Sequence, residues 1–208
     1  MNILYRENGK PRAYVTMFFI VCTVAVWCVM EFFGDTLSGS YVLEHGGMYP
    51  ASILEQGEWY RLFTSVFIHF GADHLANNMI ILLATGDKLE DAVGKWRFFL
   101  IYIGAGLCGN LLSLYEMVKT GDYAVGAGAS GAIFGIIGAL VWIAVRNHGQ
   151  FEGLTTRGLL LMILLCLYYG FTTMGVDNWA HIGGALSGFA LCFILTLFMK
   201  TPEEELIF

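Results

Sequence analysis

The sequence predicts an all-α, polytopic membrane protein in which six apolar helices form one bundle. The 208 residues are 57% hydrophobic and only 13% charged, whereas soluble domains carry about 25% charged residues. Several apolar runs reach the roughly 17–25 residues that a helix needs to cross about 30 Å of hydrocarbon. Such uninterrupted runs favour spanning helices over the alternating strands of a membrane barrel.

The apolar runs define the order of the predicted elements. The six spans are expected at about residues 14–33, 74–87, 96–114, 130–145, 157–174 and 179–199. We expect them to form a single domain over residues 1–208. Gly34 ends the first span as a C-terminal glycine would. This span follows Arg6, Lys10 and Arg12 and lacks a small-residue cleavage site, so it is expected to be a retained helix.

A long first loop separates the first two spans. Residues 35–70 mix glycine, proline and acidic residues with many aromatic side chains. The loop is too polar for a span and too aromatic for a free linker, so we expect it to lie in the membrane interface. The second span carries His74, Asn77 and Asn78 in its first turns, and polar groups in a membrane helix need a partner or a functional role.

Loop charges predict the orientation, because Lys and Arg are enriched on the cytoplasmic side of a membrane. If both termini are cytoplasmic, the inner basic residues are Arg6, Lys10, Arg12, Lys88, Lys95, Arg97, Arg146, Arg157 and Lys200. The outer ones are Arg61 and Lys119. The sequence therefore predicts a multi-pass protein of the cell membrane with both termini inside. Spans two, four and six then begin near the outer face, which brings together four polar side chains: His74, Asn78, Ser130 and His181.

Charge and cysteine content weigh against other classes of protein. The net charge is −6, and the acidic residues are expected mainly in loops and in the tail at 203–205, so no nucleic-acid partner is predicted. The five cysteines fall inside apolar segments, where they behave as small hydrophobic residues rather than as a disulfide framework or a metal site. They are Cys22, Cys28, Cys108, Cys166 and Cys192.

A glycine-rich stretch surrounds the most reactive-looking group of the chain. Gly126, Gly128 and Gly131 flank Ser130 and suit a tight turn into a helix whose free N–H groups point toward the hydroxyl. A serine in this setting has the features of a nucleophile with an oxyanion hole. The alternative is helix packing, because Gly131 and Gly135 are small residues four apart.

The fourth span, which Ser130 begins, is short. Its 16 residues, 130–145, extend about 24 Å at roughly 1.5 Å per residue, less than the hydrocarbon layer of about 30 Å. Ser130 is therefore expected to lie below the membrane surface.

His181 begins the sixth span and could supply a base. An imidazole within hydrogen-bond reach of a serine hydroxyl can take its proton, although a lone histidine at an interface is more often a hydrated side chain. Gly184 and Gly188 lie on the same helical face as His181, so another backbone can come close there. The expected partner surface is Gly131, Gly135 and Gly138.

His69, His74 and Asn78 could instead indicate a metal site. The two histidines are five residues apart, and no H-E-x-x-H motif occurs. Neutral donors to a developing oxyanion fit these side chains better, so neither a metal nor a cofactor is expected.

In combination these motifs resemble the rhomboid family of intramembrane serine proteases, over nearly all six spans. The similarity rests on G-A-S-G at 128–131, H-L-A-N-N at 74–78, A-H-I-G-G at 180–184 and E-W-Y-R at 58–61. The resemblance implies a Ser130–His181 catalytic dyad. It also implies an oxyanion hole formed by Asn78, His69 and the Ser130 backbone N–H, with His74 supporting the top of the second span.

Two positions bear on how closely the chain follows this family. Phe134 stands where better-known bacterial members carry a tyrosine that stacks on the catalytic histidine, so the ring is kept and the hydroxyl is lost. No acid lies on the face of His181 in its span, and Asp177 in the preceding loop is interpreted as a solvated residue rather than a third catalytic member.

The resemblance implies an endopeptidase that cleaves single-span membrane proteins near the outer end of their transmembrane helix, without a cofactor. One alternative is a rhomboid-like protein that binds membrane helices without cutting them, although the presence of both Ser130 and His181 argues against it. Another is a small transporter that binds an ion at a glycine-broken helix. It lacks support, since the sequence has no inverted repeat or paired buried charges.

Overall fold

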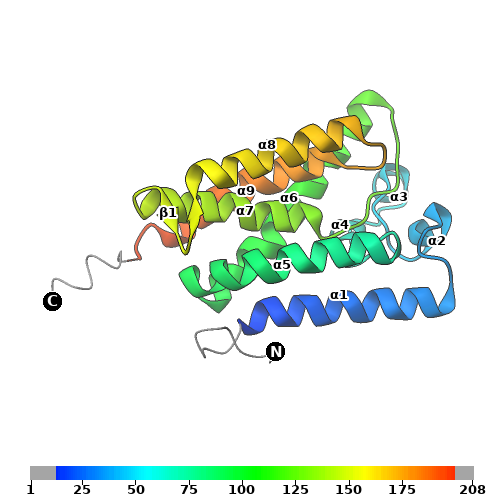
Figure 1. The fold of residues 1–208 in the computed structure, drawn as a ribbon. Helices are drawn as coiled ribbons and strands as arrows, with labels where there is room; N and C mark the ends of the chain where they lie inside the picture. Colours follow the sequence, from blue (N-terminus) through cyan, green and yellow to red (C-terminus); the bar gives the residue numbers. More distant parts are fainter. Residues whose placement is uncertain (1–12, 200–208) are drawn as a thin grey trace.

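The computed structural model describes residues 13–199. Arg6, Lys10, Arg12, Lys200 and the acidic residues 203–205, which enter the charge predictions, lie outside the described residues. The described part contains six long helices that run side by side (Figure 1). They are α1 (Tyr14–Phe33), α5 (Gly71–Val93), α6 (Lys95–Thr120), α7 (Ser130–Arg146), α8 (Thr156–Thr172) and α9 (Asn178–Thr196).

The helices differ in their capacity to cross a bilayer. Within the described residues, α1, α6 and α9 are each long and apolar enough to do so. α5 passes the same test only together with the preceding α4 (Arg61–Thr64) and η1 (Ser65–Phe67), against which it is bent by 89°. α7 and α8 are apolar but have only 17 residues each. The chain is thus an all-α, multi-pass membrane protein, and the count of six crossings stays a prediction.

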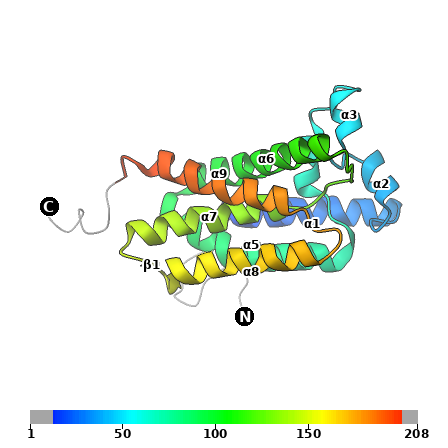
Figure 2. The same cartoon turned by 90° about the horizontal axis from the view of Figure 1, so that it is seen from above.

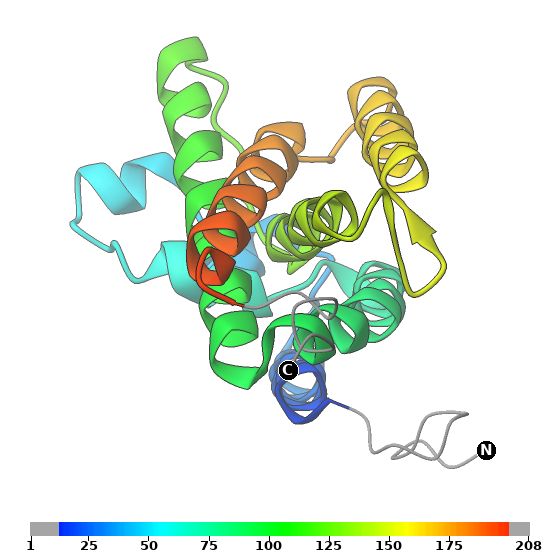
Figure 3. The ribbon, with the colours of Figure 1, turned by 90° about the vertical axis from the view of Figure 1, so that its left-hand side faces the viewer.

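α7 occupies the centre of the bundle. Figure 3, which looks along the helices, shows α5, α6, α8 and α9 around it and α1 outside α5. Figure 2 shows α8 and α9 on either side of α7 from a second direction. Residues 131–141 are all buried, as expected for a helix that is apolar on every side.

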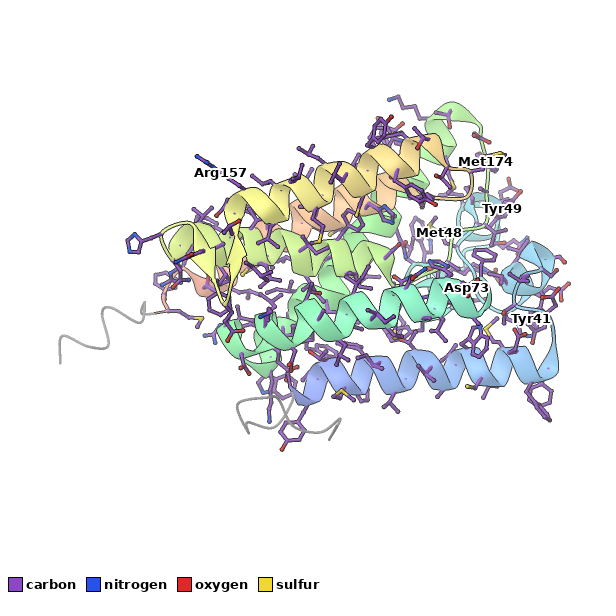
Figure 4. The ribbon with its side chains drawn as sticks, viewed as in Figure 1. Tyr41, Met48, Tyr49, Asp73, Arg157 and Met174 are labelled. Atoms are coloured by element: carbon purple, nitrogen blue, oxygen red, sulfur yellow. The ribbon has the colours of Figure 1, made fainter. Side chains whose placement is uncertain are left out.

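The long helices alternate in direction, so α5, α7 and α9 all begin at the same end of the bundle (Figure 1). Met48 and Asp73 lie at this end, and Arg157 lies at the opposite end (Figure 4). We call these the Ser130 end and the Arg157 end. The start of α1 and the end of α9 both lie at the Arg157 end.

The first loop folds into short helices around a buried arginine. The elements between α1 and α4 are α2 (Gly39–Glu44) and α3 (Pro50–Leu54). The Arg61 side chain donates to the Glu58 carboxylate at 2.6 Å and to the carbonyls of Leu43 and Gly47 at 2.6 and 2.8 Å. A buried guanidinium is tolerated when its donors are satisfied in this way. Placement of the loop in the membrane interface stays a prediction.

α5 continues past the predicted end of the second span at 87 and stops at Val93. Its far end carries buried acids that bind the start of α1: Asp87 accepts from the Ala13 N–H at 2.9 Å, and Glu90 accepts from the N–H and hydroxyl of Thr16 at 2.7 and 2.9 Å. Negative groups are stabilising at a helix N-terminus, where N–H groups lack intrahelical acceptors. The expectation that acidic residues lie mainly in loops is therefore wrong for this pair.

A small β-hairpin, which the sequence analysis does not predict, joins α7 to α8. It pairs β1 (Gln150–Phe151) with β2 (Leu154–Thr155). The two turn residues, Glu152 and Gly153, have φ values of 44° and 78°, which is the left-handed backbone that two-residue hairpins favour. The Lys88 ammonium donates to the Glu152 carbonyl at 3.1 Å and so connects the hairpin to α5.

Candidate active site

Where α7 and α9 cross, glycines bring the two backbones into close contact. A Cβ atom at Gly184 would overlap the carbonyl oxygen of Gly131, and one at Gly188 would overlap that of Gly135. Gly138 meets the backbone of α9 in the same way. These are the contacts that the glycine spacing predicts, and they allow the helices to approach more closely than larger residues would.

α9 also packs closely against α6. A Cβ atom at Gly109 would be 2.6 Å from the Ala180 carbonyl oxygen, and one at Gly183 would be 3.0 Å from the Gly109 Cα. α9 therefore fits between two backbones, with His181 in its first turn at the Ser130 end.

Ser130 and His181 are hydrogen-bonded across this crossing. The Ser130 Oγ lies 2.9 Å from the His181 Nε2, which is the reach that a general base needs to take a hydroxyl proton. The His181 ring stacks on Phe134, with ring centroids 4.2 Å apart and planes 5° apart. The second ring nitrogen, Nδ1, is buried and has no hydrogen-bond partner among the described residues. The arrangement can activate a hydroxyl as a nucleophile.

The loop that precedes Ser130 is bonded to the first loop. Met48 and Gly126 exchange two main-chain hydrogen bonds of 2.8 Å each, and the Gly128 N–H donates to the Ser65 carbonyl at 2.9 Å. These bonds fix the chain on the approach to α7. The Ser130 N–H lies in the first turn of α7, where N–H groups have no acceptor inside the helix, so it is available to a ligand.

His69 and His74 lie in different surroundings. His69 is fully buried, and its Nε2 accepts the Ala129 N–H at 3.2 Å, so this nitrogen cannot donate to the site. The His74 ring is partly exposed and lies against Gly128, where a Cβ atom would be 2.8 Å from its Cε1 and 3.0 Å from its Nε2. Asn78 follows one turn later on α5 and donates one amide hydrogen to the His74 carbonyl at 2.9 Å. Of the two histidines, His74 is thus the one whose ring is partly exposed beside the loop before Ser130.

The prediction that Asp177 is a solvated loop residue is wrong. Its carboxylate accepts the Ala180 N–H at 2.9 Å as the N-cap of α9, and it also accepts the Ser113 hydroxyl of α6 at 2.5 Å. Asp is among the residues most favoured at an N-cap, so its position just before a predicted helix was the sequence signal for this role. The partner on α6 could not be found in that way, because a lone serine in an apolar run carries no such signal.

The described residues contain no cluster of three His, Cys, Asp or Glu side chains that could hold a metal ion. The polar groups at the Ser130 end include a hydroxyl, imidazoles, an amide, backbone N–H groups and the carboxylates of Asp73 and Asp177.

Comparison with known proteins agrees with this architecture. Residues 56–198 match the family described as the rhomboid domain. Rhomboid protease GluP of Bacillus subtilis (strain 168) is 36% identical over 183 residues, which are 88% of this chain and 34% of GluP. RHOMBOID-like protein 5 of Arabidopsis thaliana is 39% identical over 153 residues, or 73% of this chain and 48% of that protein. Putative rhomboid protease YdcA of Bacillus subtilis (strain 168) is 31% identical over 138 residues, or 66% of this chain and 68% of YdcA.

The helices and the family match together define a multi-pass helical membrane protein. The chain belongs to the rhomboid family, as its motifs predict. It spans less than half the length of GluP and of RHOMBOID-like protein 5.

Proposed function

We propose that this protein is an intramembrane serine endopeptidase that uses a Ser130–His181 dyad. The observation that carries the proposal is the 2.9 Å contact between the Ser130 hydroxyl and the His181 imidazole at the start of a buried apolar helix. Family membership supports it, since GluP is named as a rhomboid protease.

In the proposed reaction, the Ser130 Oγ attacks a peptide carbonyl while the His181 Nε2 takes its proton. The imidazolium then gives the proton to the leaving amine, which leaves an acyl-enzyme on Ser130. Water hydrolyses the ester with His181 again as the base. Stacking on Phe134 keeps the imidazole plane directed at the hydroxyl during both steps.

The developing oxyanion would be bound by the Ser130 N–H, the Asn78 amide and the His74 ring. His74 replaces His69 in this proposal because the Nε2 of His69 already accepts the Ala129 N–H. Removing a strong oxyanion donor lowers kcat by about 10²–10³-fold. Asn78→Ala and His74→Ala should therefore lower kcat with little change in KM. If kcat is normal in His74→Ala and falls strongly in His69→Ala, His69 rather than His74 is the oxyanion donor.

We further propose that residues 1–208 form one domain with six spans, both termini in the cytoplasm and the active site open to the extracytoplasmic side. α7 has 17 residues, about 26 Å at roughly 1.5 Å per residue, so Ser130 would lie below the outer surface of a bilayer about 30 Å thick. A helical substrate hides its carbonyls and must unwind there. Single-span proteins with Gly, Ala or Ser near their outer end should be preferred, because small residues such as glycine lower the cost of unwinding.

Mass spectrometry of the products from a panel of single-span proteins tests the orientation and the preference. Cuts should cluster near the outer end and weaken when the small residues become Leu or Val. Cuts near the cytoplasmic end would overturn the proposed orientation.

Covalent labelling tests the enzymatic function itself. The purified, reconstituted protein is incubated with a serine-reactive phosphonate, and the labelled residue is mapped. Labelling at Ser130, and loss of both labelling and cleavage in Ser130→Ala and in His181→Ala, are expected. No labelling and no cleavage by the wild-type protein would favour a rhomboid-like protein that binds membrane helices without cutting them.

A further inference from the structure

Asp177 connects three parts of the Ser130 end. It lies in the turn between α8 and α9, four residues before His181. One carboxylate oxygen accepts the Ala180 N–H at 2.9 Å, and the Asp177 carbonyl accepts the His181 N–H at 3.2 Å. The second carboxylate oxygen accepts the Ser113 hydroxyl from α6 and lies about 4.0 Å from where a Cβ atom at Gly126 would be.

These bonds also show what Asp177 does not do in this structure. Both of its carboxylate oxygens are engaged, one by Ala180 and one by Ser113. The His181 Nδ1 has no hydrogen-bond partner among the described residues. The carboxylate therefore does not orient the imidazole directly, as the acid of a catalytic triad would.

The glycine faces of α9 give such an end contact a structural role. Interlocking side chains normally fix the position of one helix along another. Where α9 crosses α6 and α7, the contacts at Gly109, Gly131, Gly184 and Gly188 are backbone to backbone. Contacts of this kind allow a close approach but offer few side-chain ridges that resist sliding or rotation.

Polar contacts hold α9 at both of its ends, in addition to the ring contacts that Trp142 of α7 makes with Phe189 and Phe193. At the Arg157 end, the guanidinium of Arg97 donates to the Leu195 carbonyl at 3.0 Å, and that of Arg146 donates to the Thr196 carbonyl at 2.6 Å. At the Ser130 end, the Asp177 carboxylate bonds α9 to Ser113, which is buried on α6.

We propose that Asp177 is a positioning residue that sets the height and rotation of α9, and thereby the distance between His181 and Ser130. The inference rests on the proposed peptidase function. A displacement of about 1 Å in a catalytic group can cost about 100-fold in rate, so a modest shift of α9 is enough to impair proton transfer.

The test compares four single variants and one double variant in proteoliposomes by kcat, KM and the rate of phosphonate labelling at Ser130. Asp177→Ala should lower kcat and the labelling rate by about 10–100-fold, with KM within about twofold of the wild-type value. Asp177→Asn should recover part of the loss, because Asn is also a good N-cap. Ser113→Ala should lower kcat, and adding it to Asp177→Ala should cause little further loss, because both changes remove one contact. Asp122→Ala, an exposed acid in the loop before α7, is the matched control and should be as active as wild type.

The outcomes separate this inference from the proposed function. If the wild-type protein neither cleaves a substrate nor is labelled by the phosphonate, the peptidase proposal itself is overturned. If the wild type is active and Asp177→Ala has normal kcat, or the double variant shows fully additive losses, the positioning role is overturned. If Asp177→Ala does not fold, Ser113→Ala decides: a lower kcat with unchanged KM supports the role, and a normal kcat overturns it.

Discussion

α8 and α9 are apolar helices of similar length that both pack against α7, yet they are attached to it in different ways. Nine residues of α9 are buried, against two of α8, Leu159 and Gly170. α9 meets α7 backbone to backbone, whereas α8 exposes large apolar side chains along much of its length. These include Leu161, Leu164, Leu165, Tyr168 and Phe171.

The difference shows that hydrophobicity alone does not determine where a helix sits in this bundle. Small residues direct α9 into the interior, because they let backbones touch. Large residues on α8 suit contact with lipid. The helix that carries His181 is thus the more firmly held of the two, and four substitutions test this contrast.

The largest effect is expected for Gly184→Leu. A Cβ atom at this position would overlap the Gly131 carbonyl oxygen, so α9 must move away from α7 and carry His181 with it. A shift of about 1 Å should lower kcat about 100-fold or more. Cleavage by the membrane-extracted variant is the measurement, with Leu186→Ala on the exposed side of α9 as its control. Full activity in Gly184→Leu would show that α9 does not pack against α7 as described.

A smaller effect is expected for Phe134→Ala, which removes the ring stacked on His181. An aromatic pair contributes about 0.5–1.5 kcal/mol beyond its buried area, so kcat should fall about 10-fold through loss of imidazole orientation. Phe134→Tyr keeps the ring and should retain wild-type kcat. A large gain in Phe134→Tyr would instead indicate that a hydroxyl at this position takes part in the reaction.

Gly170→Leu should affect stability more than catalysis. A Cβ atom there would overlap the amide oxygen of Asn178, the first residue of α9. Overpacking of this kind costs about 1–3 kcal/mol. Because α8 is loosely attached, we expect α8 rather than α9 to move. The midpoint of thermal inactivation should fall, and kcat should stay within about threefold of the wild-type value. A kcat loss as large as that of Gly184→Leu would contradict the contrast between the two helices.

Leu165→Ala should have the smallest effect. Leu165 is exposed on α8, and substitutions at such positions usually change the free energy of unfolding by less than about 0.5 kcal/mol. Thermal inactivation and kcat should both match wild type. A marked loss of stability would mean that this face of α8 packs against protein rather than lipid.

The sequence predicts the packing of α9 well because its small residues recur at helical spacing. This spacing can be recognised even in a sequence that is apolar throughout. Gly131, Gly135, Gly184 and Gly188 all lie where their spacing places them. The roles of His69 and His74 could not be separated in the same way. They depend on where α5 begins, at Gly71 with φ of 71°, which leaves His69 in the bend before the helix and His74 on its first turns.

Other contacts could not be predicted, because nothing in the sequence distinguishes the residues that make them from residues without such a contact. The bonds between Met48 and Gly126 join main-chain atoms, so no side chain reveals them. In the sequence, Asp87 and Glu90 resemble the polar residues that end a span. They accept hydrogen bonds from the start of α1 only because α1 packs against α5. Long-range partners of this kind require the fold.

The position of His181 on the last described helix has a consequence for biosynthesis. Ser130 begins α7, and its proposed base follows in the chain only with α9, which packs against both α6 and α7. A nascent chain that has not yet reached α9 holds the serine without the imidazole. In the proposed enzyme, hydrolytic competence therefore arises only after α9 has joined the bundle. If the proposed function holds, neighbouring membrane proteins would not be exposed to an active protease before α9 has joined the bundle.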